Sequence, residues 1–169
     1  MRLIFSIIIT ILFSFNTIAR EIGETEITTE DGIEVFQDEK YYLLKKNVKI
    51  LSDNFNLNAK DVKIDFDKSL YDITELNAKG EVNFVSSKFG MSSKSESLKF
   101  EVKTERLKVN GKNSELITKD IKMYSDGFIE INNLNGDFKL EGPNSKLINE
   151  SIFIKAEKID GIFSNIGDQ

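Results

Sequence analysis

The sequence predicts an all-β protein, and three observations support this prediction. Beyond residue 20, apolar residues recur at every second position rather than with the 3.6-residue period of a helix. Asx-Gly pairs, which favour tight turns, interrupt the alternating segments. The motif Leu-Asn-Ala-Lys occurs at 57–60 and again at 76–79. Together these features indicate short antiparallel strands that repeat a structural unit within one domain.

The first nineteen residues differ from the rest of the chain. Met1 and Arg2 precede an apolar run at 3–15, and small residues follow up to Ala19. This pattern predicts a signal peptide at 1–19, cleaved after Ala19, and a single domain at 20–169. A retained anchor is the alternative, although the run is shorter than the roughly 20 residues of a spanning helix. Loss of Arg2 would leave 22 basic and 28 acidic residues, a net charge of −6.

The composition excludes several kinds of chemistry. The chain has no Cys and no His, so it offers no thiol nucleophile, no imidazole base and no zinc site of the usual kind. No phosphate-binding glycine loop or nucleophile elbow is present. We therefore predict no catalytic residues, no metal, no cofactor and no enzyme activity. The acidic balance also argues against nucleic acid, which is bound through basic contacts to phosphate.

One position in the alternation is irregular. Apolar residues occupy odd positions from 55 to 59 and even positions from 62 to 66. Such a slip would turn every later side chain to the opposite face unless a bulge or corner compensated for it. The sequence therefore predicts a corner at Lys60 and Asp61. A looser third copy of the motif, beginning at Ile154, suggests that Ala59, Ala78 and Ala156 have one repeated structural role.

Turns and larger repeats divide the remaining chain. Asn110-Gly111, Asp126-Gly127 and Asn135-Gly136 are predicted hairpin turns, and Pro143 follows Gly142 in a further turn. Units that start at 47, 81 and 120 share alternating apolar residues, a Ser-containing turn and then Phe. Each such hairpin-like unit can bury its apolar face only against neighbouring units.

The apolar positions define one predicted interior face. Two interpretations remain open for it, a closed packed core or a groove lined for a lipid, because a facing sheet and an acyl chain remove apolar surface from water equally well. The predicted lining residues are Val48, Ile50, Phe55, Leu57, Ala59, Val62, Ile64, Phe66, Leu76, Ala78, Val82, Phe84, Met91, Leu98, Phe100, Val102, Ile121 and Met123.

The order of the motifs resembles the OstA-like family, and within it most closely the LptA branch of periplasmic lipopolysaccharide-transport proteins. Residues 27–31 match an opening Ile-x-x-x-Asp, residues 57–62 match Leu-x-Ala-x-x-Val, and 76–82 match Leu-x-Ala-x-Gly-x-Val. A strand then closes on Asn110-Gly111. The similarity covers 27–111 well and 112–163 more loosely. The family's usual Gly-Asn-Val is split, since Val48 lacks the preceding Gly and Val82 the preceding Asn.

This resemblance implies a folded-over antiparallel β-jelly roll with an apolar interior slot. It implies a periplasmic protein that binds the lipid A acyl chains of lipopolysaccharide and stacks end to end with OstA-like inner- and outer-membrane transport proteins. Head-to-tail self-association would use the predicted first strand, 27–36, and the predicted last strand, 152–159. The alternatives are an anchored inner-membrane relative of the LptC type and a structural β-repeat protein without a ligand.

Overall fold

The structure is a computed structural model that describes residues 24–163, and strands but no helices occur in that range. The strands are β1 (Glu26–Thr28), β2 (Ile33–Phe36), β3 (Tyr41–Leu51), β4 (Phe55–Phe66), β5 (Ile73–Ser86), β6 (Met91–Glu101), β7 (Arg106–Asn110), β8 (Ser114–Thr118), β9 (Lys122–Ser125), β10 (Phe128–Asn132), β11 (Asp137–Glu141), β12 (Lys146–Ile148), β13 (Phe153–Lys155) and β14 (Lys158–Ile162). The predicted signal peptide lies outside the described residues.

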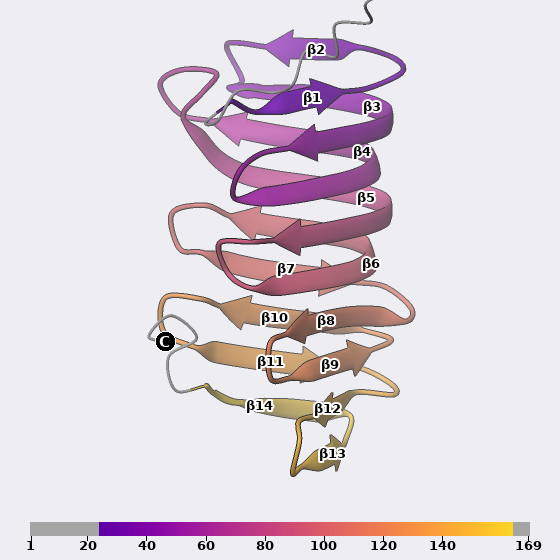
Figure 1. The fold of residues 1–169 in the computed structure, drawn as a ribbon. Coiled ribbons are helices and arrows are strands. Elements are labelled where there is room, and N and C mark those ends of the chain that lie inside the picture. The colour runs from indigo at the N-terminus through magenta and orange to yellow at the C-terminus, as the bar shows by residue number, and fades with distance from the viewer. Residues whose placement is uncertain (1–23, 164–169) are drawn as a thin grey trace, which may run out of the picture.

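All fourteen strands form one antiparallel sheet that folds back on itself into two layers (Figure 1). Leaf 1 contains β1, residues 48–51, 55–58, 82–86 and 91–95 of β3 to β6, and then β8, β9, β12 and β13. Leaf 2 contains β2, residues 41–45, 61–66, 73–79 and 97–101 of the same long strands, and then β7, β10, β11 and β14. The long strands thus cross from one leaf to the other.

The crossings line up along one side of the molecule, which we call the corner. The register shifts between Lys45 and Val48 in β3, between Asn58 and Asp61 in β4, and between Lys79 and Val82 in β5. The shift in β4 confirms the corner predicted from the slipped alternation. Both Leu-Asn-Ala-Lys copies end at this line, approached from opposite leaves, and their Ala59 and Ala78 are buried there. Ala156 also lies at the corner but is exposed.

Positive backbone angles make the bend possible in the long strands. Lys46 and Asn47 have φ of 64° and 53°, and Gly80 and Glu81 have φ of 78° and 49°. Each pair turns the chain sharply while the flanking residues stay in the ladder. A Cβ on Gly80 would lie 2.7 Å from the Lys60 Cβ, so the neighbouring crossings also pack closely against each other.

The shorter strands turn the corner with a motif that sequence reasoning missed. Residues 111–114 and 142–145 both read Gly-x-Asn-Ser, and Asn113 and Asn144 have φ of 57° and 58°. In each copy the Ser Oγ donates to the Gly carbonyl three residues earlier, at 2.7 Å. The buried hydroxyl therefore satisfies a turn carbonyl, which is a common use of Ser in turns. The recurrence of Gly-x-Asn-Ser thirty-one positions apart was the available signal.

Two of the predicted hairpin turns are wrong. Asn110-Gly111 and Asp126-Gly127 do not join paired strands, because β7 pairs with β6 and β10 whereas β8 pairs with β6 and β9. They are corners, and the third repeated unit therefore crosses between leaves instead of forming a hairpin. Asn135-Gly136 does connect the paired strands β10 and β11. Gly111 has a positive φ of 120° but Gly127 does not, so an Asx-Gly pair does not by itself distinguish a corner from a hairpin.

The predicted terminal strands are each divided. The segment 27–36 forms β1 and β2, one on each leaf, and 152–159 spans β13 and the start of β14 in the same way. The alternation continues across the first corner, from Ile27 to Ile33, so it could not locate that break. At the second corner the inward position changes from Ile154 to Ile159, and this slip in parity was a signal for the break. The two pairs nevertheless lie at opposite ends of the molecule, as Figure 1 shows.

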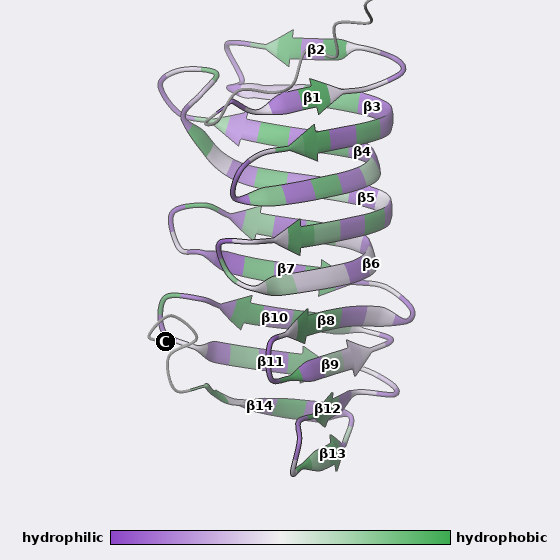
Figure 2. Ribbon diagram, in the orientation of Figure 1, coloured by the Kyte–Doolittle hydropathy of each residue, from purple (hydrophilic) through white to green (hydrophobic). Residues whose placement is uncertain are grey.

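The core lies between the leaves. Hydrophobic and hydrophilic residues alternate along most strands (Figure 2), so that each leaf turns one apolar face inward and a polar face outward. Leu44, Leu57, Leu107, Ile131 and Leu140 are fully buried. Burial of one such side chain contributes roughly 1.5–3 kcal/mol to stability.

Glycines where two crossings meet provide a test of the corner. Gly142 has φ of 129°, and a Cβ there would lie 2.6 Å from the Gly127 Cα. Gly142→Ala should lower the free energy of unfolding by about 3 kcal/mol. Gly32→Ala is the matched control, because Gly32 also has positive φ, 84°, but has open space around its Cβ position; it should cost about 1 kcal/mol. Urea unfolding measures both, and equal losses would contradict close packing at the corner.

Asp126 links the two Gly-x-Asn-Ser copies. Its carboxylate accepts hydrogen bonds from the Asn144 side-chain amide, at 2.7 Å, and from the Asn113 backbone N–H, at 2.8 Å. These bonds, the former first, hold the pKa of Asp126 below its ordinary value. The ionised form is favoured in the folded state, so its stabilising contribution is present above the unfolded-state pKa and is lost as pH falls through the lower folded-state pKa.

Asp126→Asn should therefore make the stability of the protein less dependent on pH in the acidic range. We expect the melting temperature of the wild type to fall more steeply than that of the variant as pH drops below the ordinary value of 3.8. Asp120→Asn is a control, since no hydrogen bond to the exposed Asp120 side chain is found within the described residues. Parallel wild-type and Asp126→Asn curves would rule out this role of Asp126.

Candidate functional site

Most residues of the predicted interior lining are buried between the leaves. These are Val48, Ile50, Leu57, Ala59, Val62, Ile64, Phe66, Leu76, Ala78, Val82, Phe84, Met91, Leu98, Phe100 and Met123. Phe55 and Ile121 are partly buried and pack against this cluster. Val102 is different, because it is 40% exposed and follows the end of β6. It nevertheless lines the same pocket as Phe84 and Phe100.

The predicted lining also stopped too early. The core continues into the C-terminal half through Leu107, Val109, Leu116, Ile129, Ile131, Leu140, Leu147 and Ile159. Alternation in β7, β10 and β11 was the signal for these residues. The interior is filled by the protein's own side chains, so a lipid chain would have to enter where the two leaves separate.

The leaves separate along the side opposite the corner, which we call the seam. There the turns 52–54 and 87–90 of leaf 1 face the turns 67–72 and 102–105 of leaf 2. A pocket of about 300 Å³ lies between them. Phe55, Phe84 and Phe89 line it from leaf 1, and Ile73 and Phe100 line it from leaf 2.

Aromatic rings connect the two sides of this seam pocket. The Phe84 and Phe100 ring centroids are 6.3 Å apart, and those of Phe89 and Phe100 are 6.1 Å apart. Phe55 contacts Phe84 at a centroid distance of 5.8 Å. Tilted aromatic contacts of this kind are each worth about 0.5–1.5 kcal/mol beyond burial. They can also be replaced by contacts with a flat or linear apolar ligand, because they are not directional in the way that hydrogen bonds are.

One ion pair bridges the seam above the aromatic rings. Lys88 Nζ in leaf 1 lies 2.9 Å from Glu105 Oε1 in leaf 2, and it also lies 4.7 Å from the centre of the Phe89 ring. The Lys88 side chain is 52% exposed. A solvent-exposed pair contributes at most about 1 kcal/mol, so this contact closes the seam only weakly.

A second hollow, which we call the mouth, lies at the β1–β2 end. It has a volume of about 1010 Å³, and Ile33, Val35, Leu70 and Tyr71 line it. These side chains are 51%, 52%, 44% and 93% exposed, a concentration of apolar surface that soluble proteins usually cover. Tyr71 and Ile73 line both the mouth and the seam pocket. The two hollows therefore form one apolar tract from the end of the molecule to the seam.

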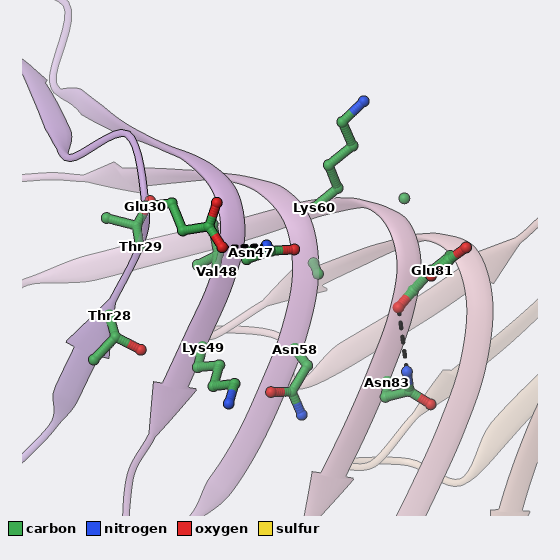
Figure 3. Close-up of a pocket in the computed structure, with 12 residues that line it drawn as sticks. Thr28, Thr29, Glu30, Asn47, Val48, Lys49, Asn58, Lys60, Glu81 and Asn83 are labelled. Atoms are coloured by element: carbon green, nitrogen blue, oxygen red, sulfur yellow. Dashed lines mark hydrogen bonds between the residues drawn. The ribbon is translucent and has the colours of Figure 1, made fainter.

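A third hollow, of about 700 Å³, lies on the outside of the corner and is polar (Figure 3). The Asn47 amide donates to the Glu30 carboxylate there, and the Asn83 amide donates to the Glu81 carbonyl. The Lys46 and Glu30 side chains also form an ion pair, at 3.2 Å. These groups satisfy one another, and apart from Val48, Ala59 and Gly80 the residues that line the hollow are polar.

Residues 24–163 contain no group of three His, Cys, Asp or Glu side chains placed to hold a metal ion. Within the same range, no helix is long and apolar enough to cross a membrane.

Comparison with known proteins identifies the fold. No protein-family model matches the sequence, and no curated protein matches it. Among solved structures, the chain is similar to LptH, the LptA homologous periplasmic component of the conserved lipopolysaccharide transport device from Pseudomonas aeruginosa, with a TM-score of 0.55. The chain has an LptA-like β-jelly roll fold. The match covers 65% of this chain and 76% of LptH, at 10% sequence identity, so it establishes the fold and confirms the predicted fold class.

Proposed function

We propose that the chain is a periplasmic, LptA-like carrier that binds the lipid A acyl chains of lipopolysaccharide and passes them from the inner to the outer membrane. The continuous apolar tract from mouth to seam is the observation that carries this proposal. It is open at one end of the molecule and is lined by residues of both leaves. No step requires catalysis, because removal of acyl methylenes from water, at about 0.8 kcal/mol each, supplies the binding free energy.

The seam allows the interior lining to take part. An acyl chain that displaces the Phe84–Phe100 and Phe89–Phe100 contacts would reach Leu76, which also lines the seam pocket. Partial separation of the leaves costs the weak Lys88–Glu105 pair and the aromatic contacts, while the corner stays hydrogen-bonded. The predicted interior residues would then contact the bound acyl chain instead of contacting one another.

An LptC-like component with a retained anchor is the second candidate. It would have the same fold and would differ from the carrier in keeping its N-terminal segment. Residues 1–23 lie outside the described range. Sequencing of the mature N-terminus separates the two: a start at Arg20 supports the soluble carrier, and an intact Met1 in the membrane fraction supports the anchored component.

Photo-cross-linking tests the apolar tract. A benzoylphenylalanine at Tyr71 or Phe89 should form adducts with lipopolysaccharide, because these side chains line the mouth and the seam pocket. The matched control is Phe128, which faces outward from leaf 2 with Lys108 Nζ 4.1 Å from its ring centre. Adducts are read by mass spectrometry. Equal labelling at all three positions, or labelling at Phe128 alone, would refute the proposed tract.

Head-to-tail association with copies of this chain, or with OstA-like inner- and outer-membrane proteins, is part of the proposal. β1 and β2 end the sheet on one side, and β13 and β14 end it on the other. Such edges present unpaired N–H and C=O groups that another strand can extend. Pairing of unlike ends builds an open filament, which would continue the apolar tract from one molecule to the next.

The register identifies which amides of β13 are free to pair. Asn149 N–H donates to the Ile152 carbonyl, and Ala156 N–H donates to the Ser145 carbonyl. Because hydrogen-bonded pairs alternate in antiparallel ladders, Ile154 also bonds to β12. The Phe153 and Lys155 amides then point to the open edge. Proline at Ile154 would instead break an internal hydrogen bond.

Lys155→Pro should therefore abolish association and preserve the fold, because it removes an outward donor from an edge strand. Ile154→Pro is the contrasting variant and should destabilise β13. Light scattering over a concentration series, with circular dichroism, measures both effects. Growth of the wild type with concentration that persists in folded Lys155→Pro would contradict pairing through β13.

A further inference from the structure

The outer faces of the two leaves differ in how they balance charge. In the C-terminal half, the strand segments of leaf 2 carry five cations, Lys99, Arg106, Lys108, Lys139 and Lys158, and five anions, Glu101, Glu130, Asp137, Glu141 and Asp160. The corresponding segments of leaf 1 carry four lysines, Lys94, Lys122, Lys146 and Lys155, and one carboxylate, Glu115. The basic excess of leaf 1 occurs on a chain whose net charge is −5.

The lysines of leaf 1 also lack the ion pairs that leaf 2 has. On leaf 2, Lys99 lies 2.9 Å from Glu75 and 3.1 Å from Glu101, Lys108 lies 3.6 Å from Glu130, and Lys139 lies 2.7 Å from Glu141. On leaf 1, none of the four lysines forms an ion pair with a described residue. Lys94 is opposite Glu115 in the ladder, but their charged groups do not meet.

The difference between the leaves is clearest at one pair of facing lysines. Lys146 and Lys155 are directly opposite each other in the β12–β13 ladder, and like charges in that position repel. Lys99 and Lys108 are opposite in the same way on leaf 2, but their carboxylate partners offset the repulsion. At the leaf 1 pair, Lys146 Nζ lies over the Tyr124 ring at 4.4 Å, which leaves its charge in place. Both lysines line a hollow of about 540 Å³ with Asn144 and Phe153, and Glu115 and Asp126 also line it.

Apolar side chains follow the lysines along this face. Ile117 and Ile148 flank Lys122 across the ladder and are half-buried, and Phe153, opposite Ile148, is 65% exposed. We name the surface formed by the four lysines, Ile117, Ile148 and Phe153 the basic face. Lysines beside exposed aliphatic and aromatic groups suit the boundary of a lipid layer, where ammonium groups meet phosphates and apolar groups reach the acyl region.

We propose that the basic face binds an anionic membrane surface, with the facing ammonium groups of Lys146 and Lys155 contacting the phosphate of a lipid headgroup. Lys94, Lys146 and Lys155 lie in one row across the ladder with a single carboxylate, Glu115, and Lys122 lies in the next row. This excess of cations suits a layer of anionic headgroups. The headgroup phosphate offsets the repulsion between Lys146 and Lys155, and Phe153 anchors the edge of the face. This peripheral docking is separate from the apolar tract and does not depend on it.

Vesicle flotation tests the proposal with two variants of equal net charge. The wild type should bind vesicles of phosphatidylcholine with about one phosphatidylglycerol in three, should bind pure phosphatidylcholine far less, and should be released by added salt. Replacement of Lys94, Lys122, Lys146 and Lys155 by Gln should weaken binding at least about tenfold. Replacement of Lys99, Lys108, Lys139 and Lys158 by Gln removes the same number of charges from leaf 2 and should leave most of the binding.

A double variant with fewer substitutions controls for misfolding. Lys146→Gln with Lys155→Gln relieves the like-charge contact, so it should not lower the melting temperature, yet it should reduce vesicle binding severalfold. Equal losses in the leaf 1 and leaf 2 variants, or absence of binding to the anionic vesicles, would overturn the proposal. Binding of inorganic phosphate or of an acidic protein without vesicle binding would overturn it as well. Photo-adducts at Tyr71 and Phe89 serve as the independent readout of the apolar tract.

Discussion

The bend of every row of the sheet at one line is the constraint on which the remaining structure depends. At this corner the chain leaves regular strand geometry, with positive φ at Asn47, Gly80, Asn113 and Asn144. Such angles cost little at Gly and Asn and more at other residues. Because the bends stack, neighbouring crossings support one another, as the close approach of Gly127 and Gly142 illustrates. The strand segments on either side of the corner therefore face each other across an apolar interior.

The same arrangement leaves the opposite side weakly closed. A sheet folded along one line is held together there by its backbone, whereas its two free sides meet only through side chains. The seam has aromatic contacts and the Lys88–Glu105 pair. Non-directional contacts can be exchanged for contacts with a ligand, while a corner made of backbone hydrogen bonds cannot. The fold therefore combines a fixed side with an adaptable one, which suits a carrier of flexible acyl chains.

Alternation predicted the all-β class, the burial of most interior residues and the corner in β4, because side-chain parity directly reports which face a residue occupies. It did not separate corners from hairpins at Gly111 and Gly127, since an Asx-Gly pair occurs in both kinds of turn. It did not divide 27–36, because a corner that preserves parity leaves no mark on the pattern, whereas the slip from Ile154 to Ile159 did mark the corner within 152–159. The seam pocket, the mouth and the basic face depend on which strands become neighbours, and only the fold determines that. The ladder places Lys146 opposite Lys155, nine positions away in sequence.

We expect the seam to open and admit a lipid while the corner stays fixed. Since the chain has no cysteine, spin labels can be placed at Ser87→Cys in leaf 1 and Lys103→Cys in leaf 2, on exposed turns that face each other across the seam. Pulsed electron resonance then measures the distance between them with and without lipopolysaccharide. The account predicts a longer and narrower distance distribution in the lipid-bound protein. An unchanged distribution in protein that demonstrably carries lipid would contradict it.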